Sequence, residues 1–264
     1  MRITYRRGNI KDYWTQRWDT ISADIPMENT SAYPLKYAEE AIAANDGKIL
    51  EAGCGAGRLL RYYKERGYDI TGFDFIDSVV NKLKSIDPEL NVETGDILNL
   101  SYADKSFKYI LSFGLYHNIE HGLDQAIKET YRVLEPGGIV CASFRADNLQ
   151  TRLTDWYASY NARKKTGNHS TKGFHKMNLK KHEFIDLFKR GGFDIHEVYD
   201  VENMPVLYKF SFFRSRQHKV FDENLARKDG YQLSFSGGLL QRFLMRYFSS
   251  NFCNLYVLIA QRPN

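Results

Sequence analysis

A glycine-rich loop directly follows the first run of the sequence that predicts a buried strand. The stretch ILEAGCGAGR (49–58) ends its apolar run near Glu51 and then places Gly53, Gly55 and Gly57 at alternate positions. In an open α/β sheet, ligands bind beyond the carboxyl ends of the strands, and glycines let the backbone approach them closely. The loop therefore predicts a binding site for a nucleotide-like ligand.

Carboxylates at three strand ends narrow the kind of ligand. Glu51 precedes the glycine loop, Asp74 ends the next predicted strand, and Asp96 in TGDIL follows the third. Three carboxylates would repel a polyphosphate, whereas they attract a cation and accept hydrogen bonds from hydroxyl and amino groups. Arg58 also stands where a dinucleotide-binding loop would need its third glycine, which disfavours a dehydrogenase. A cationic nucleoside is the ligand that fits this pattern best.

Strands and helices alternate from residue 48 onward, and they would position these side chains. The runs that predict strands cover 48–52, 69–74, 90–94, 106–114, 138–144, 193–201 and 252–261. The runs with apolar residues at helical spacing cover 57–67, 77–86, 122–134 and 178–193. This alternation predicts a parallel, doubly wound α/β sheet whose carboxyl edge brings the glycine loop and the acids together.

Four segments resemble, in order and spacing, the motifs of class I S-adenosylmethionine-dependent methyltransferases over about residues 47–145. These segments are ILEAGCGAGR, GFDF, GDILNLSYADKSFKYILSFGLYHNIEH and ETYRVLEPGGIV. The resemblance implies a Rossmann-like sheet of seven strands, the last one antiparallel, with S-adenosyl-L-methionine as the cofactor. Methyl transfer from this cofactor is an in-line displacement, which needs alignment of the two reactants and sometimes a base.

The resemblance also implies roles for residues around the methionine part of the cofactor. The backbone of Gly53 and Gly55 is expected to lie against this part, with Glu51 near its ammonium group. Residues from Phe113 to His117, after the fourth strand, are expected beside the sulfonium.

At the nucleoside part, the resemblance places Asp74 at the ribose hydroxyls and Asp96, with Ile97, at the adenine. Hydroxyls and an exocyclic amine are donors that a carboxylate accepts from, which agrees with these roles. Phe75, next to Asp74, has two interpretations, because it could stack on the adenine or belong to the core.

Two histidines in GLYHNIEHG could take a proton from the acceptor. His117 is the first candidate for the catalytic base and His121 the second, since an imidazole can accept a proton near neutral pH. The alternative is that either ring only packs or caps this loop. Tyr116 is a candidate for the part of the binding-site wall that contacts the substrate.

Three segments predict a cap at the carboxyl edge of the sheet, all within a single domain of residues 1–264. The resemblance implies that residues 1–46 form an N-terminal lid over the cofactor, in which Tyr13 is expected on the substrate side; the alternative is a helix that only packs on the sheet. The insertions 145–177 and 202–252 follow the fifth and sixth strands, so both emerge beside the ligand.

A helical segment of the second insertion has its apolar side chains on one face. Residues 237–248 place leucine and aromatic side chains on this face and two arginines on another. The pattern predicts either a helix packed on the domain or a peripheral contact with a membrane.

Composition and charge restrict the remaining possibilities. The first 146 residues contain 18 Lys and Arg against 21 Asp and Glu, whereas residues 147–264 contain 19 against 11, which favours an anionic acceptor. No apolar run of about 18 residues and no signal-like segment occurs, so a cytoplasmic location is expected. The three cysteines lie far apart and the histidines lack ligand spacing, so no metal site is predicted.

Methyl transfer to a small or lipid-linked anionic acceptor, such as a sugar or surface-polysaccharide intermediate, is the function that these observations favour. The basic second half leaves an RNA methyltransferase as an alternative, although no NPPY-like tetrapeptide for a flipped base follows the fourth strand. A protein that binds the cofactor without catalysis is a further alternative, because binding motifs do not prove turnover. The expected partner is a small-molecule or lipid-linked substrate and not a nucleic acid.

Overall fold

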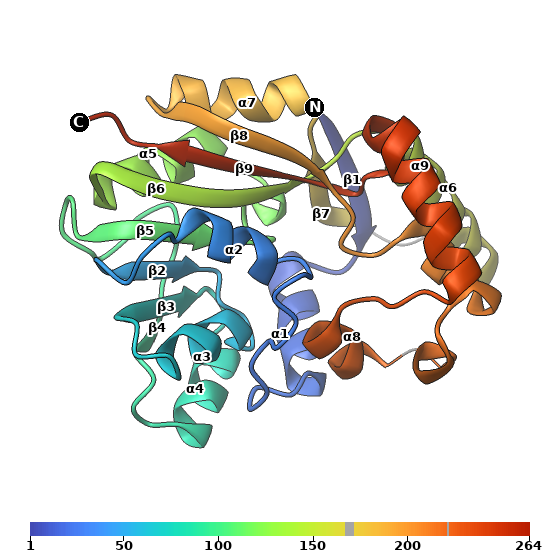
Figure 1. The fold of residues 1–264 in the computed structure, drawn as a ribbon, viewed down its shortest axis with the longest axis horizontal. Coiled ribbons are helices and arrows are strands. Elements are labelled where there is room, and N and C mark those ends of the chain that lie inside the picture. Colours follow the sequence, from blue (N-terminus) through green and yellow to red (C-terminus); the bar gives the residue numbers. More distant parts are fainter. Residues whose placement is uncertain (167–171, 221) are drawn as a thin grey trace.

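A seven-stranded sheet forms the centre of the computed structural model, which describes residues 1–166, 172–220 and 222–264 (Figure 1). The strand order is β4-β3-β2-β5-β6-β9-β8. These strands are β2 (Ile49–Ala52), β3 (Ile70–Asp74), β4 (Val92–Thr94), β5 (Phe107–Ser112), β6 (Leu134–Arg145), β8 (Asp194–Val201) and β9 (Leu255–Gln261). Neighbours from β4 to β6 are parallel, whereas β9 runs antiparallel to both β6 and β8. The predicted doubly wound α/β sheet, with seven strands and the last one antiparallel, is confirmed.

Alternating side chains bury both faces of this sheet. Ile49 belongs to the buried cluster under one layer of helices, and the next residue, Leu50, belongs to the cluster under the other layer. The first layer contains α2 (Leu35–Ala41), α3 (Arg58–Lys64) and α4 (Asp77–Ile86). The second layer contains α5 (Leu123–Val133) and α7 (Lys181–Arg190). The sheet is therefore a rigid base on which the strand ends hold their side chains.

A second, two-stranded sheet joins the N-terminal segment to the first insertion. β1 (Arg2–Arg7) pairs antiparallel with β7 (Lys172–Asn178), and neither strand was expected from the sequence. α1 (Ile10–Thr20) follows β1 in the chain and packs against α4. α6 (Leu149–Thr166) precedes β7 in the chain. The sequence does not reveal this sheet because each strand finds its partner far away in the chain.

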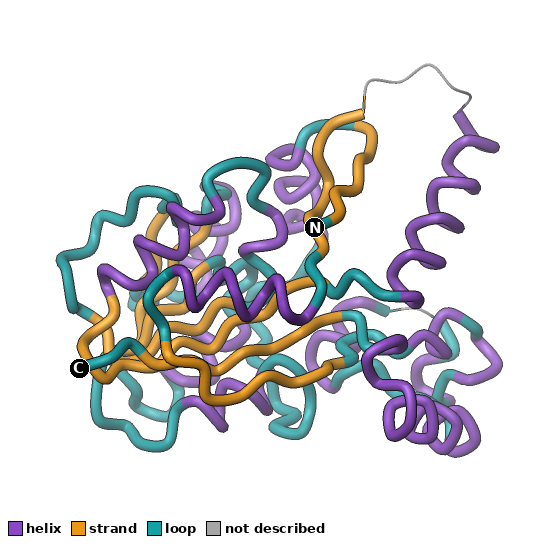
Figure 2. The backbone as a smooth tube through the Cα atoms, turned by 90° about the horizontal axis from the view of Figure 1, so that it is seen from above, coloured by secondary structure: helices purple, strands orange, loops and turns teal. Residues whose placement is uncertain are grey.

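The second insertion lies at the same end of the molecule as α6, on the right in Figure 1. Its elements are η2 (Val206–Lys209), η3 (Ser211–Phe213), η4 (Arg216–His218), α8 (Glu223–Asp229) and α9 (Phe235–Phe252). Figure 2 shows α6 extending away from the central sheet at this end. None of the described helices combines the length and the apolar character needed to cross a bilayer.

Candidate functional site

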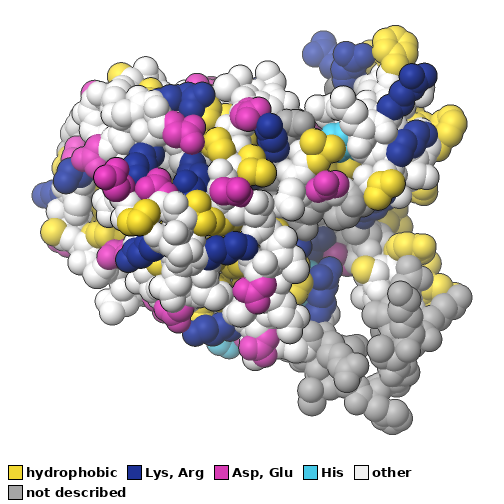
Figure 3. All heavy atoms as spheres, turned by 90° about the horizontal axis from the view of Figure 1, so that it is seen from below, with side chains coloured by type: hydrophobic (Ala, Val, Ile, Leu, Met, Phe, Trp, Pro, Cys, Tyr) yellow, Lys and Arg dark blue, Asp and Glu magenta, His cyan; other side chains and the backbone are white. Residues whose placement is uncertain are grey.

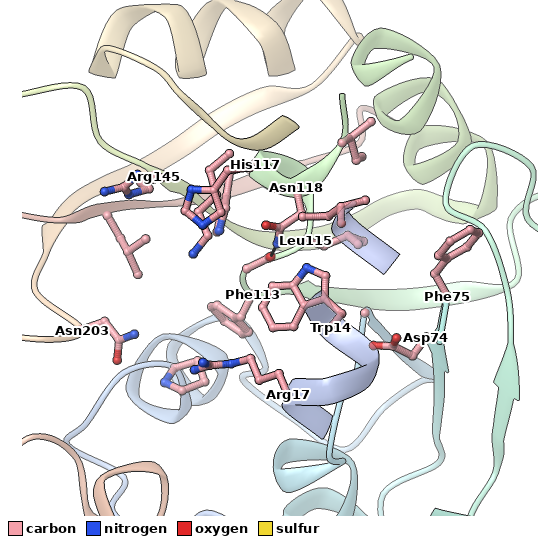
Figure 4. Close-up of a pocket in the computed structure, with 18 of the residues that line it drawn as sticks. Trp14, Arg17, Asp74, Phe75, Phe113, Leu115, His117, Asn118, Arg145 and Asn203 are labelled. Carbon is pink, nitrogen blue, oxygen red and sulfur yellow. Dashed lines mark hydrogen bonds between the residues drawn. The ribbon is translucent and has the colours of Figure 1, made fainter. Parts of the chain in front are cut away.

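A cavity of about 630 Å³ opens at the carboxyl ends of the parallel strands, within the size range of small-molecule sites (Figure 4). Its floor consists of residues near the ends of four strands. Glu51 is the next-to-last residue of β2, Asp74 ends β3 and Arg145 ends β6, whereas Gly53 follows β2 and Phe113 follows β5. Residues of the N-terminal segment and of both insertions complete the wall, among them Trp14, Lys176 and Lys209. The strand ends thus bring together residues that are far apart in the sequence.

The glycine loop after β2 is held by the neighbouring strand. Gly53 and Cys54 donate their backbone N–H groups to the carbonyl oxygen of Phe73, both at 2.9 Å. Gly53 lines the cavity and has a φ of 73°, which favours glycine, and a Cβ there would lie 3.2 Å from the side chain of Leu115.

Gly55 does not line the cavity, which corrects the expectation that its backbone lies against the ligand. A side chain at Gly55 would meet the ring of Trp18, because a Cβ there would lie 2.5 Å from that ring. The backbone N–H of Gly55 instead donates to Oδ2 of Asp74 at 2.8 Å. Gly55 therefore supports Asp74 and accommodates the helix α1 above it.

Asp74 is buried, and two backbone groups fix its carboxylate. Oδ2 accepts from Gly55, and Oδ1 accepts from the N–H of Ile76 at 3.0 Å. Burial raises the pKa of Asp74, while the N–H groups of Ile76 and Gly55 oppose that shift. Each carboxylate oxygen has a second lone pair, so the group can still accept from a ligand in the cavity that it lines.

The cavity wall also contains the other residues that were predicted to contact the nucleoside part of the cofactor. Asp96, Ile97 and Phe75 all line the wall. Asp96 is exposed and its Oδ1 caps the N–H of Leu98 at 2.9 Å, whereas Ile97 is buried. Phe75 is half-exposed, with the Nζ of Lys11 5.1 Å from its ring centre.

The loop after β5 places Phe113 and His117 in the wall, as Figure 4 shows. The ring of Phe113 packs edge-on against Tyr33, whose hydroxyl lies 2.9 Å from Oγ of Ser143. That Oγ also accepts from the N–H of Gly114 at 2.9 Å. These contacts hold the loop in the cavity wall.

His117 is buried in the cavity wall, and its Nδ1 has no hydrogen-bond partner among the described residues. Burial lowers the pKa of His117 well below its usual value, and the charges of Lys176 and Arg145 lower it further. The ring is therefore neutral at physiological pH and can accept a hydrogen bond or a proton. His121 lies at the rim of the same cavity with 90% of its side chain exposed.

Two residues predicted on the substrate side lie elsewhere. Tyr116 is fully buried in the core, packs edge-on against Phe188 and hydrogen-bonds Oγ1 of Thr130 at 2.7 Å. The single-turn helix η1 (Tyr116–Asn118) turns His117 toward the cavity and Tyr116 away from it. Tyr13 packs against Trp14, which lines the cavity in its place. Both assignments to the substrate wall were wrong.

A group of basic side chains at the end of the cavity away from Asp74 was not predicted. This basic end consists of Arg6, Arg17, Arg145, Lys176 and Lys209, all of which line the cavity. Burial, followed by the charges of Arg145, Arg6 and Arg17, lowers the pKa of Lys176 to about 7. In Figure 4, Arg145 and Asp74 lie on opposite sides of the cavity. The cavity therefore has an acidic and a basic end.

Arg145 has binding capacity left at the basic end. Its Nη2 donates to Oδ1 of Asp155 at 2.6 Å, whereas its buried Nη1 has no partner among the described residues. His175, also in the wall, has a buried Nε2 without a partner in the same part of the chain. Buried polar atoms without a hydrogen-bond partner are costly unless a ligand or water satisfies them.

One member of the basic end could have been found from the sequence. Arg145 directly follows the predicted strand 138–144, so the rule that strand ends face the ligand applies to it. Arg6 and Lys176 carry no such signal, because they come from the unpredicted sheet of β1 and β7.

Comparisons with known proteins agree with this geometry. Residues 50–142 match the model of a family described as methyltransferase domain. Demethylmenaquinone methyltransferase from Paenarthrobacter aurescens is 34% identical over 130 residues, which are 48% of this chain and 51% of that protein. Malonyl-[acyl-carrier protein] O-methyltransferase from Enterobacter lignolyticus is 28% identical over 42% of this chain and 44% of its own length. The chain thus spans about half the length of these curated relatives.

The fold comparison extends over most of the chain. A structure of an S-adenosylmethionine-dependent methyltransferase from Methanosarcina mazei superposes with a TM-score of 0.57 and 18% identity. The match covers 88% of this chain and 98% of that one, so the two chains share their fold over most of their length.

Proposed function

Because this chain belongs to the class I S-adenosylmethionine-dependent methyltransferases, whose cofactor is S-adenosyl-L-methionine, we propose that it methylates an anionic small-molecule acceptor. The acceptor carries a phosphate or carboxylate and is free or lipid-linked, such as a sugar or surface-polysaccharide intermediate. The division of the cavity into an acidic and a basic end carries this proposal. The relative named demethylmenaquinone methyltransferase supports a small molecule as acceptor.

The acidic end suits the cofactor. In the proposed arrangement, Asp74 accepts from the ribose hydroxyls and Asp96 from the adenine amine, with Ile97 and Phe75 against the ring. Glu51 lies near the ammonium group of the methionine part, which its charge attracts. The buried position of Asp74 and its two backbone donors support this role, because they hold the carboxylate ready for a ligand.

The basic end suits an anion. Arg145 and Lys176 are close enough for each charge to affect the other, as the lowered pKa of Lys176 indicates. Such mutual repulsion is relieved when an anion binds between cations, and an arginine can bind a phosphate or carboxylate through two donors. The unpartnered Nη1 of Arg145 and Nε2 of His175 support a ligand in this place.

The reaction joins the two ends. Bound S-adenosyl-L-methionine would supply a methyl group to a nucleophilic atom of the acceptor, and S-adenosylhomocysteine would leave with the electron pair of the broken carbon–sulfur bond. In the proposed mechanism, the neutral His117 accepts the proton that the acceptor loses. Its place in the cavity wall and its Nδ1, which has no hydrogen-bond partner among the described residues, support this role.

The experiment is methyl transfer from labelled S-adenosylmethionine into a metabolite and lipid extract, with mass identification of the labelled product. We expect label in a molecule that carries a phosphate or carboxylate. Label confined to added RNA would instead support the RNA methyltransferase. Tight binding of S-adenosylhomocysteine without label in any fraction would support the protein that binds without catalysis.

A matched pair of variants then tests the basic end. Arg145→Gln should raise the KM for the identified acceptor at least tenfold while the affinity for S-adenosylhomocysteine stays unchanged. Asp155 keeps its ion pair with Arg2 in this variant, so no charge is left unpaired. The control is Arg190→Gln on α7, which removes an exposed ion pair far from the cavity. An unchanged KM in Arg145→Gln would overturn the anionic acceptor.

A further inference from the structure

The helix α6 has its apolar side chains on the outside. The exposed ones recur at helical spacing and share one face, namely Leu149, Leu153, Trp156, Tyr157 and Tyr160. Trp156 is 64% exposed and stacks on Tyr160 with ring centres 5.9 Å apart. The opposite face is polar and faces inward, where Gln150, Thr151 and Thr154 line the cavity. This arrangement is the reverse of an ordinary surface helix.

The helix α9 is inverted in the same way. Its inner side contains Gly237, Gln241 and Ser249, whose contacts with the domain are small or polar, and Met245, which packs against the buried cluster under α5 and α7. Gln241 donates to Glu202, and Ser249 donates to Asp200 at 2.7 Å. Its outer side contains four exposed apolar residues at helical spacing, namely Leu239, Leu240, Phe243 and Tyr247.

These two helices and the loop before α8 form one end of the molecule. α6 and α9 contact each other, and Nδ2 of Asn148 donates to the carbonyls of Ser250 at 3.0 Å and Cys253 at 2.7 Å. Phe210 and Phe212 add two exposed rings from η3 and the residue before it. We call the exposed apolar residues of α6, α9 and this loop the aromatic end. Soluble proteins rarely expose so many apolar side chains together unless the surface binds something.

Two long segments of the chain at the aromatic end contain basic residues and no acidic ones. Residues 203–220 and 230–252 contain no Asp or Glu. They contain Lys209, Arg214, Arg216, Lys219, Arg242 and Arg246. Figure 3 shows hydrophobic and basic side chains next to one another at this end, on the right. A surface that is both apolar and basic is complementary to a layer of anionic headgroups over acyl chains.

We infer that the aromatic end binds the surface of a bilayer that contains anionic lipids. A second copy of this chain fits less well, because a symmetric contact would bring two copies of the same basic surface together, and these two segments contain no Asp or Glu to neutralise it. Trp and Tyr rings, which α6 presents, favour the level of the headgroups, where one edge is apolar and the other is wet. This inference goes beyond the proposed function and does not rest on it. Where both hold, the inner face of α6 lines the cavity that would receive an acceptor from the membrane.

The test is co-sedimentation of the purified protein with vesicles of phosphatidylglycerol and phosphatidylcholine, compared with vesicles of phosphatidylcholine alone. We expect binding to the anionic vesicles, weakened by salt, together with a blue shift of Trp fluorescence that is absent in Trp156→Phe. Arg242→Gln/Arg246→Gln should lower the partition coefficient about thirty-fold, since each basic residue near an anionic surface contributes about 1 kcal/mol. Phe243→Ser/Tyr247→Ser should lower it further on vesicles of either composition.

Matched controls keep the outcome interpretable. Lys84→Gln/Lys128→Gln and Ile86→Ser remove exposed side chains of the same kinds from α4 and α5, away from the aromatic end. Each variant is checked by circular dichroism and thermal unfolding. Binding of wild type no stronger than that of Phe243→Ser/Tyr247→Ser, or equal loss in the controls, would overturn the inference. So would a dimer in light scattering that Phe243→Ser/Tyr247→Ser dissociates, because the surface would then be an interface between copies.

Discussion

Lys176 is a side chain whose charge depends on pH in the physiological range. Burial and the neighbouring Arg145, Arg6 and Arg17 lower its pKa to about 7, so the protein without an anion loses this charge as the pH rises through 7. Sulfate keeps its charge between pH 6 and pH 8, so it can serve as a probe for anion binding near Lys176. Its affinity should fall up to about tenfold from pH 6 to pH 8, in proportion to the protonated fraction of Lys176. Calorimetry measures this, and Lys176→Arg should remove the pH dependence because arginine stays charged.

Asp74 is expected to contribute to cofactor binding through charge-assisted hydrogen bonds. Asp74→Ala should weaken the binding of S-adenosylhomocysteine by about 1 to 3 kcal/mol, because it removes an acceptor for the ribose and frees the N–H groups of Gly55 and Ile76. Calorimetry gives the affinity. Asp69→Ala is the control, since Asp69 precedes the same strand at its other end and is exposed. Equal loss in both variants would mean that β3 is destabilised and that Asp74 has no direct role.

His117 is expected to act on the reaction rather than on binding. His117→Ala should lower kcat about 100-fold and leave the affinity for S-adenosylhomocysteine nearly unchanged. Because the pKa of His117 lies well below its usual value, the wild-type rate should not fall between pH 8 and pH 6 through protonation of this ring. A comparable loss of cofactor affinity or of thermal stability in the variant would make the role structural.

Single residues were predictable where a strand end determines their place. Glu51, Gly53, Asp74 and Phe113 line the cavity as the order of motifs suggested. Tyr116 was not predictable, because a single helical turn decides which of two adjacent side chains enters the core. No local pattern in the sequence specifies such a turn.

At the scale of elements, the amino group of Lys82 holds the C-terminal end of α1 through hydrogen bonds. Nζ of Lys82 on α4 donates to the carbonyls of Trp18 at 3.0 Å and Ile21 at 2.7 Å, where the helix ends and its last carbonyls lack partners. Trp14 and Trp18 stack on this helix, and Trp18 covers Gly55. The helix therefore covers the glycine loop from a position that Lys82 holds.

Removing that amino group should loosen α1. Lys82→Met is expected to lower the free energy of unfolding by about 1 to 2 kcal/mol and to speed hydrogen exchange in α1 more than in β2 or β5. The KM for the cofactor should rise in parallel if α1 closes over it. Lys84→Met, an exposed lysine on the same helix, should change none of these. Uniformly faster exchange in Lys82→Met would show that α1 does not move as a separate unit.

The elements of the central sheet were predictable, since each follows from a local period of two or of 3.6 residues. β1 and β7 were missed because a strand with a distant partner carries no cue to that partner. The outward direction of the apolar face of α9 was not predicted, for another reason. The sequence shows that the helix has an apolar face, but only the fold decides whether that face points inward or outward.

At the scale of the whole molecule, the two halves of the chain differ in charge, although three members of the basic end, Arg6, Arg17 and Arg145, belong to the first half. Residues 1–146 have more acids than bases and residues 147–264 have more bases than acids. For an anionic acceptor, attraction over a distance speeds association and is screened by salt. The KM for the acceptor should therefore rise between about 0.02 and 0.3 M salt more steeply than the KM for the cofactor, in steady-state kinetics. Equal slopes would mean that the bases of the second half act only locally or not at all.

The pairing of β1 with β7 has a consequence for the way in which the protein is made. Arg2 and Asn178, which are joined at this sheet, are 176 residues apart along the chain. The strand–helix units around the glycine loop are neighbours in sequence, so they can form while translation is still under way. β1 cannot pair until the ribosome has synthesised β7. The entropic cost of closing the long loop between the two strands must then be overcome before their contacts form. The order of synthesis thus gives an order of assembly, in which the acidic end exists in the nascent chain before the basic end does.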